Sequence, residues 1–372
     1  MERIALIGDP HFARKAEHPL IKKHIKDGQE AYFDFVVSEL NKNNIKTVLI
    51  SGDLHDTRQS INVEALVLTK RLLQTKMKDF DVHIILGNHD MYYENSYDIT
   101  ALELFEDIPN VTVYRNEVEM KTFLGKTWYM FPWIIHEREN STVEFLKKLA
   151  SKPLKDRNNT VLFGHFEMFG INMEGNSMST FGLDPNTFMD ASNTIFSGHY
   201  HGKSITEKSS SKLVYLGSPY PMTFANANQQ HGIWLVDENL NTEFIENKIS
   251  PRFVDIWDTD DMDLLDDLTN CFVRLYINKT ITSEKEFEIR LKIENKKPIL
   301  IRTLPYNGSK AEIEQKTEAE KEANRIIKMS TLDLAEIYID QNSEILPSLR
   351  LSNDPKAAIM SKLNLYNETI KT

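Results

Sequence analysis

The sequence feature that most constrains the fold is the stretch Leu86-Gly87-Asn88-His89-Asp90. The apolar run Val82–Leu86 predicts a buried strand, and the glycine predicts the tight turn that ends it. An amide, an imidazole and a carboxylate then follow without a spacer. A polar loop is the structural alternative, but three polar groups of different chemistry at one strand end favour a functional site.

The same design recurs at four other places in the chain. In each, a run rich in β-branched residues ends in glycine, and a carboxylate or an imidazole follows: Ile4–Ile7 before Asp9-Pro10-His11, Thr47–Ile50 before Asp53, Thr160–Phe163 before His165, and Thr194–Phe196 before His199-Tyr200-His201. Near-continuous apolar strands are typical of a sheet covered on both faces. In such sheets the chemistry lies beyond the carboxyl ends of the strands, where all five clusters fall.

The polar groups in these clusters form a candidate set of metal ligands. Its members are Asp9, His11, Asp53, Asn88, His165, His199 and His201. Two Asp, one Asn and four His without cysteine suit manganese, iron or zinc rather than a structural thiolate zinc site. A lone histidine at a strand end is more often a satisfied core residue, but five such coincidences argue against that. Seven ligands exceed the needs of one ion, so the sequence predicts two ions that share one bridging carboxylate.

The five strand-end clusters resemble the sequence motifs of the calcineurin-like metallophosphoesterases. Their order and rough spacing match over about the first 220 residues. Within that superfamily, Gly52-Asp53-Leu54-x-Asp56-x-Arg58 and Leu216-Gly217-Ser218-Pro219 resemble the SbcD type, the nuclease subunits of double-strand-break repair and phage recombination complexes. The Gly-Asp-x-Val-Asp-Arg-Gly motif of the protein phosphatases is absent from the sequence.

The resemblance implies both a fold and an activity. The fold is an α/β class, four-layer α/β/β/α sandwich. The activity is that of a manganese-dependent, two-metal DNA nuclease, with exonuclease action on duplex ends and endonuclease action on single strands. Two alternatives stay open: a phosphodiesterase of a small substrate such as a cyclic nucleotide, and a non-catalytic scaffold.

Each candidate ligand has an expected place. We assign Asp9, His11 and His201 to the first ion, Asn88, His165 and His199 to the second, and Asp53 to both. His89 is not needed as a ligand, so we expect it to protonate the leaving oxygen or to stabilise the pentavalent phosphorus. Asp90 or another carboxylate would then fix its tautomer. The alternative for His89 is a hydrogen bond within the loop.

Other polar and aromatic side chains are candidates for DNA contacts. Arg58 and the pair Tyr92-Tyr93 flank the predicted site and would contact phosphate, stack on a base or only pack. The most basic stretch follows His11 and predicts either a rim for phosphate or a solvated helix face; it contains Arg14, Lys15, Lys22 and Lys23. His55 departs from the SbcD type, which usually has an aromatic residue there, and is not expected to be a ligand.

Composition bounds the class of protein. A chain of 372 residues allows roughly two or three domains, and its 41% hydrophobic content suffices for a large core. The single cysteine, Cys271, excludes an intrachain disulfide and fits a reducing compartment. We identify neither an export signal nor an apolar run long enough to span a membrane, so we expect a cytoplasmic protein. The net charge of −11 predicts weak intrinsic affinity for DNA.

The sequence predicts three consecutive regions. Residues 1–250 form the nuclease domain, with strands over Val111–Tyr114 and Thr127–Phe131 among others. Residues 251–305 form a small α+β module, with an acidic helix-like segment from Asp258 to Asp267 and two strands. The resemblance implies that this module is a capping domain that helps to select DNA.

Residues 306–372 form a polar linker with two short amphipathic helices, which are too short to be stable alone. We expect them to dock on a partner, or otherwise to fold back on the nuclease domain. Their apolar faces carry Leu332, Ile339, Ile359, Leu363, Tyr366 and Ile370. The resemblance implies a partner, an SMC-like ABC ATPase of the SbcC type, and a homodimer within a heterotetramer. The chain has no phosphate-binding loop of the ATPase type itself.

Overall fold

A computed structural model describes residues 2–12, 19–171, 173, 178–308 and 310, although the side chains of residues 19, 20, 22 and 24–26 are not described. Residues up to Asn307 form one compact unit. The predicted partner-binding residues lie outside the described residues, as do Arg14 and Lys15; they are Leu332, Ile339, Ile359, Leu363, Tyr366 and Ile370.

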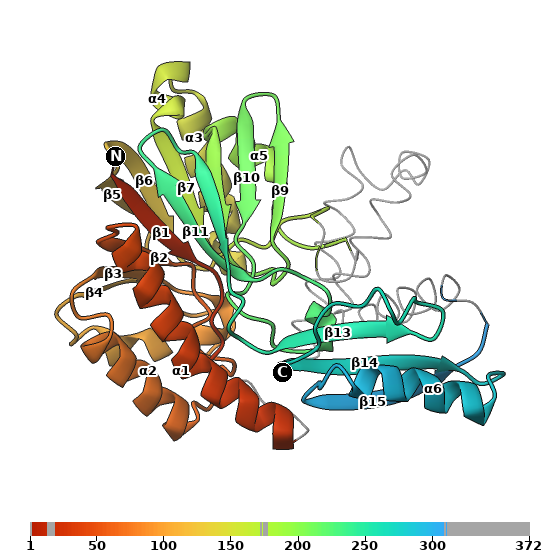
Figure 1. Ribbon diagram of the computed structural model, residues 1–372. Coiled ribbons are helices and arrows are strands. Elements are labelled where there is room, and N and C mark those ends of the chain that lie inside the picture. The colour runs from red at the N-terminus through yellow and green to blue at the C-terminus, as the bar shows by residue number, and fades with distance from the viewer. Residues whose placement is uncertain (1, 13–18, 172, 174–177, 309, 311–372) are drawn as a thin grey trace, which may run out of the picture. The chain divides into compact units, whose positions relative to one another are not determined.

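The first sheet has six strands in the order β12-β11-β1-β2-β3-β4. Four are parallel: β1 (Arg3–Ile7), β2 (Thr47–Ile50), β3 (Asp81–Ile85) and β4 (Val111–Tyr114). The antiparallel strands β11 (Gly232–Asp237) and β12 (Thr242–Glu246) complete one edge. Helices α1 (Pro19–Lys42) and α2 (Val63–Thr75) cover one face of this sheet, as Figure 1 shows.

The second sheet also has six strands, in the order β5-β6-β7-β8-β10-β9. Its parallel strands are β6 (Lys126–Phe131), β7 (Thr160–Gly164), β8 (Thr194–Ser197) and β10 (Ser211–Tyr215). The edge strands β5 (Glu119–Phe123) and β9 (Ser204–Lys208) are antiparallel to their neighbours. Helices α3 (Glu139–Ala150) and α5 (Pro185–Ala191) pack on its outer face, and the short α4 (Leu154–Asn158) precedes β7.

The two sheets pack face to face through a shared apolar layer. Along β1, Ile4 and Leu6 enter this layer, whereas Ala5 and Ile7 face the helices, because successive side chains of a strand alternate between faces. Trp128 stacks on Phe196 within the layer, with ring centroids 5.8 Å apart. The predicted four-layer α/β/β/α sandwich is therefore confirmed.

A third, three-stranded sheet follows the sandwich in the chain. It comprises β13 (Arg252–Trp257), β14 (Cys271–Asn278) and β15 (Leu300–Tyr306), all parallel, with α6 (Ser283–Glu294) on one face. The predicted acidic helix at Asp258–Asp267 is wrong, because this segment forms turns. Aspartate side chains there accept backbone N–H groups two or three residues away, which competes with helix formation.

The strands expected in the sandwich are present, with bounds that shift by a few residues. Three strands of the sandwich had no counterpart in the sequence interpretation, namely β5, β9 and β12. Each lies at the edge of its sheet and is partly or largely exposed, so its sequence lacks the continuous apolar run of a central strand. Among the described residues, no helix is both long enough and apolar enough to cross a membrane.

Candidate active site

The five polar clusters follow five strands whose carboxyl ends meet at one place. Three of these strands, β1, β2 and β3, belong to the first sheet, and two, β7 and β8, belong to the second. Each strand is buried, and the turn after it carries the polar side chains. The structure brings together all seven candidate ligands: Asp9, His11, Asp53, Asn88, His165, His199 and His201.

The donor atoms of these residues form two groups around Asp53. In the first, His11 Nε2 lies 3.0 Å from His201 Nε2 and 3.5 Å from Asp53 Oδ2. In the second, Asn88 Oδ1 lies 3.0 Å from His165 Nε2 and 3.3 Å from His199 Nδ1. The same Asp53 oxygen is 3.3 Å from His165 Nε2. One carboxylate oxygen therefore faces both groups of donors.

These spacings fit a metal centre. Nitrogen and oxygen ligands lie about 2.0–2.2 Å from a divalent ion, so two adjacent ligands lie roughly 3.0–3.5 Å apart. The donors meet in pairs, however: in the described part of the chain, no three His, Cys, Asp or Glu side chains are arranged to hold an ion as they stand. Small side-chain rotations would be required. The type of donor and the pairwise spacing fit two divalent ions.

Asp9 differs from the other candidate ligands in its contacts. Its Oδ2 accepts the backbone N–H of His199 at 2.8 Å, and its Oδ1 lies 3.4 Å from the hydroxyl of Ser51. The same oxygen is 3.6 Å from His165 Nδ1. Asp9 therefore links the turn after β1 to the turn after β8, which belongs to the other sheet.

The backbone around the cluster allows very close approach. A Cβ atom at Gly87 would lie 2.2 Å from both the backbone nitrogen and Oδ1 of Asp53, and one at Gly198 would lie 2.4 Å from Asp9 Oδ1. Neither position has room for a side chain, so both residues must be glycine. Three candidate ligands also have left-handed backbone conformations, which are uncommon for residues other than glycine and cluster at functional sites: His11, Asp53 and His199.

The buried carboxylates of the cluster require a neighbouring positive charge. Burial is the main cause that raises the pKa of Asp9 to about 6; the Asp53 carboxylate adds to this effect and His165 opposes it. Burial alone would lower the pKa of His165, but the carboxylates of Asp53 and Asp9 outweigh burial and raise it to about 9. In the protein without a bound cation, a protonated His165 therefore offsets the negative charge of the buried carboxylates. A bound cation would supply that charge instead and would require His165 to lose its proton.

Two further side chains and one backbone carbonyl orient the candidate ligands. Asp56 Oδ1 lies 3.6 Å from His11 Nδ1, Glu167 Oε1 lies 3.8 Å from His199 Nε2, and the Ser51 carbonyl lies 2.7 Å from His165 Nδ1. For His11 and His199 the contact is made to the ring nitrogen that does not face the other donors, whereas His165 Nδ1 also lies 3.6 Å from Asp9 Oδ1. Such outer contacts fix the orientation of metal-binding histidines.

Glu167 and Trp133 are the contributors that the sequence interpretation missed. Glu167 comes two residues after His165, a spacing that does not distinguish it from the other acidic residues of this chain. Trp133 packs against His199 and His165, with ring centroids 5.0 and 5.7 Å apart. It follows β6, a strand that ends without a polar cluster, so no sequence pattern marks it as part of the site.

His89 lies beside the first group of donors. Its ring centroid is 4.9 Å from that of His11, and its backbone N–H donates to Asp53 Oδ1 at 2.8 Å. Its Nδ1 lies 2.8 Å from the backbone carbonyl oxygen of Asp56. A carbonyl only accepts hydrogen bonds, so Nδ1 carries the proton and Nε2 is the atom that can exchange one.

The expectation that Asp90 fixes the tautomer of His89 is wrong. Both carboxylate oxygens of Asp90 accept backbone N–H groups, from Leu54 at 2.9 Å and from Gly87 at 3.0 Å. Asp90 is fully buried, and burial raises its pKa to about 7. It ties the turn after β3 to the turn after β2 and therefore acts through the backbone rather than on the reacting groups.

The candidate DNA contacts are at or near the surface. Arg58 forms an ion pair with Glu94 at 2.6 Å, and Tyr92 and Tyr93 are exposed and make an edge-to-face contact with each other. Lys23 pairs with Asp27, and the side chain of Lys22 is not described. His55 is buried and stacks on Phe105, in agreement with its exclusion from the ligand set.

Comparison with known proteins gives consistent matches. The model of the calcineurin-like phosphoesterase family matches residues 2–203. The chain is 28% identical to exonuclease subunit 1 of Enterobacteria phage T4 over 249 residues, which are 66% of this chain and 68% of that protein.

Two solved structures are similar to this chain at low sequence identity. GAP50, the anchor in the inner membrane complex of Plasmodium, matches with a TM-score of 0.41 and 11% identity over 83% of this chain and 98% of that one. A dimetal phosphatase from Danio rerio matches with a TM-score of 0.38 and 14% identity over 63% of this chain and 91% of that one.

The family match at residues 2–203 covers more than half of the chain and includes all five strand-end clusters. The chain belongs to the calcineurin-like phosphoesterase family.

Proposed function

We propose that this protein is a two-metal, manganese-dependent DNA nuclease that hydrolyses phosphodiester bonds. The observation that carries the proposal is the placement of one Asp53 oxygen between two groups of donors, at 3.5 Å from His11 Nε2 and 3.3 Å from His165 Nε2. The similarity to a phage exonuclease subunit supports DNA as the substrate. The proposed actions are exonucleolytic on duplex ends and endonucleolytic on single strands.

The proposed ligand assignment follows the two groups of donors. His11 and His201 would hold the first ion, to which the family resemblance adds Asp9, and Asn88, His165 and His199 would hold the second. Asp53 would serve both groups. The chemistry that two divalent ions supply in such sites is positive charge against the phosphate and acidified water. Carboxylate, amide and imidazole donors accept manganese as well as zinc or iron, so the choice of manganese is part of the proposal.

The protein's own residues would then orient the reacting groups. Asp56 and Glu167 hold the rings of His11 and His199, and Trp133 closes one side of the second group of donors. His89 Nε2 gives a proton to the leaving oxygen or stabilises the charge on phosphorus. General acid catalysis by a positioned histidine contributes about 10²- to 10⁴-fold.

The other regions of the chain complete the proposal. Residues 251–305 would act as the capping domain that helps to select DNA, and residues 306–372 would dock on an SMC-like ABC ATPase, with two copies of each chain in the complex. Arg58, Tyr92 and Tyr93 would contact the nucleic acid. The similarity to a protein named as a subunit supports action within a complex. The net charge of −11 is consistent with a need for a partner in DNA binding.

The test is cleavage of a linear duplex and of a single-stranded circle with Mn²⁺, with Mg²⁺ and after chelation, for the wild type and for His89→Ala. We expect manganese-dependent cleavage that His89→Ala reduces by at least 10²-fold, with metal content unchanged. The control is His136→Ala, at a side chain that is 90% exposed on the short helix η3 (His136–Arg138).

Each alternative predicts a different result. Hydrolysis of bis-p-nitrophenyl phosphate without cleavage of DNA, even with the ATPase present, would favour a small-substrate phosphodiesterase. Copurification with an ATPase but without metal would favour a scaffold. Loss of metal from His89→Ala would contradict the assignment of His89 as a residue that does not bind metal.

A further inference from the structure

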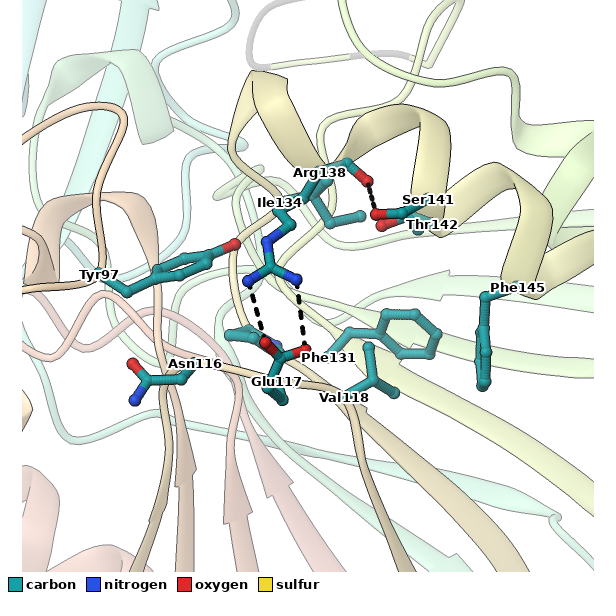
Figure 2. A pocket seen from close by; sticks show the side chains of 11 residues that line it. Tyr97, Asn116, Glu117, Val118, Phe131, Ile134, Arg138, Ser141, Thr142 and Phe145 are labelled. Atoms are coloured by element: carbon teal, nitrogen blue, oxygen red, sulfur yellow. Dashed lines mark hydrogen bonds and ion pairs between the residues drawn. The ribbon is translucent and has the colours of Figure 1, made fainter.

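A cavity of about 280 Å³ lies beside the candidate active site. Figure 2 shows the side chains that line it. It is formed by the connection between β4 and β5, by the segment after β6 and by the first turns of α3. None of the candidate metal ligands lines it. Its size is just below that of typical small-molecule sites, which suits a single ring system rather than a peptide helix.

One side of the cavity is apolar. Figure 2 shows Phe131, Val118 and Phe145 gathered on this side. The rings of Phe131 and Phe145 are in an edge-to-face arrangement, with centroids 5.9 Å apart. Such a wall favours a flat, apolar face of a ligand.

The rest of the lining carries both hydrogen-bond donors and hydrogen-bond acceptors. The guanidinium of Arg138 forms an ion pair with Glu117 at 2.9 Å, and the Asn116 amide lies near them. Both partners of this pair are largely exposed, and exposed pairs contribute little to stability, so a ligand can separate them at low cost. The Glu117 carboxylate disfavours an isolated phosphate. The cavity therefore suits a neutral ligand with hydrogen-bond donors and acceptors on its edge.

The cavity and the candidate active site share one wall. Pro132 and Ile134 line the cavity, whereas the ring of Trp133 between them contacts His199 and His165. Tyr97, also in the lining, donates its hydroxyl to the Trp133 carbonyl at 2.8 Å. A group bound in the cavity is thus separated from two candidate ligands by a single stretch of backbone.

We propose that this cavity binds one unpaired nucleobase of the substrate strand, an inference that rests on the proposed nuclease function. The base would lie against the partly exposed Phe145 and Val118 and present its edge to Arg138 and Glu117. Guanine would bind best, because its O6 and N7 accept from arginine and its amino group donates to a carboxylate. Enzymes that act on nucleic acids bind extruded or single-stranded bases in such pockets, by stacking and edge contacts.

Ser141→Trp tests the proposal by filling the cavity. Ser141 lies on α3, is exposed, lines the cavity and donates only to the Arg138 carbonyl at 2.9 Å. Ser151→Trp is the matched control, since Ser151 is exposed at the end of the same helix and donates to the Lys148 carbonyl at 2.8 Å, but does not line the cavity. Both are compared on single-stranded DNA and on bis-p-nitrophenyl phosphate, which has no base.

We expect Ser141→Trp to lower kcat/KM on single-stranded DNA roughly ten- to hundred-fold, the usual effect of losing one stacked base. Hydrolysis of bis-p-nitrophenyl phosphate should be unchanged, and Ser151→Trp should behave as the wild type on both substrates. An abasic nucleotide at one fixed distance from the cleaved bond should weaken cleavage by the wild type to a similar extent, and by Ser141→Trp no further. Glu117→Gln should reduce any preference for guanine at that position.

Two results would overturn the inference, and they are distinguishable. If the wild type cleaves DNA and Ser141→Trp cleaves it equally well, the cavity does not bind a base and the nuclease function stands. If the wild type hydrolyses bis-p-nitrophenyl phosphate but never cleaves DNA, the nuclease function fails and the base-binding cavity fails with it.

Discussion

The backbone carbonyl oxygen of Asp56 accepts a hydrogen bond from Nδ1 of His89 at 2.8 Å. The carboxylate of Asp56 lies 3.6 Å from Nδ1 of His11. One residue therefore orients both a proposed ligand and the proposed acid, through two different groups. The two contacts can be separated by mutation, because a side-chain change leaves the carbonyl in place.

Asp56→Asn should weaken metal binding while leaving His89 in position. The variant loses the negative charge beside His11, and loss of such an outer contact typically costs 10- to 100-fold in metal affinity. Isothermal titration with Mn²⁺ measures this, with exposed Asp79→Asn as the control. At saturating metal the pH dependence of turnover should match the wild type. Unchanged affinity would show that the carboxylate does not orient His11.

Asp90→Asn should act on stability before it acts on chemistry. The N–H groups of Leu54 and Gly87 are bound by different oxygens of Asp90, and in asparagine one of these oxygens is replaced by an NH2 donor, so one N–H group loses its acceptor. The unpaired buried donor should cost about 1–3 kcal/mol of the free energy of unfolding. Chemical denaturation measures the loss. If the variant has wild-type stability but lacks activity, the result would instead support a catalytic role for Asp90.

Gly87→Ala should abolish metal binding, because its Cβ would lie 2.2 Å from both the backbone nitrogen and Oδ1 of Asp53 and would displace the shared carboxylate. Gly202→Ala is the matched control beside another proposed ligand, since its Cβ would lie 3.6 Å from its nearest neighbour, Gln229. Metal content after dialysis against Mn²⁺ distinguishes the two. Equal metal content in both variants would contradict the role of Gly87.

His55→Phe should remove a source of acid instability. Burial lowers the pKa of His55 from 6.5 to about 4, so between these values the unfolded chain binds a proton that the folded protein does not. The free energy of unfolding therefore does not depend on His55 titration above pH 6.5. As the pH falls from 6.5 toward 4, it decreases by about 3 kcal/mol. Phenylalanine does not titrate and would fill the same space against Phe105.

The measurement for His55→Phe is the free energy of unfolding of both proteins from pH 7 to pH 4. The variant should be at least as stable at pH 7, because His55 Nδ1 is buried without a hydrogen-bond partner among the described residues. Its advantage should grow as the pH falls. A constant difference across this range would show that the pKa of His55 is the same in the folded protein as in the unfolded chain.

The sequence predicts the sandwich and the strand-end clusters because both depend on local patterns. The strand before Asp53 is a run of buried apolar residues, and such runs are readable without knowledge of their neighbours. Edge strand β9 follows no such pattern, since only Ser204 in it is partly buried. The turns at Asp258–Asp267 were missed because contacts from aspartate to the backbone leave no periodic signal.

The parts of the site that could not be predicted depend on contacts between distant segments. Nothing near Glu167 or Trp133 in the sequence marks them as neighbours of His199, since only the fold brings β6, β7 and β8 side by side. Likewise, the role of Asp90 follows from the position of Leu54, 36 residues away. The cavity lined by Val118 and Phe145 also arises from segments that are not adjacent in the chain.

The division of the candidate ligands between two sheets has a mechanical consequence. A bound ion would cross-link the two halves of the sandwich at their common rim, so the relative position of the sheets would become part of its coordination geometry. Any change in the apolar layer between them, such as loosening of the stack of Trp128 on Phe196, would then alter metal affinity from a distance. Conversely, loading the ions would resist shear between the sheets and raise the unfolding temperature in proportion to the logarithm of metal concentration.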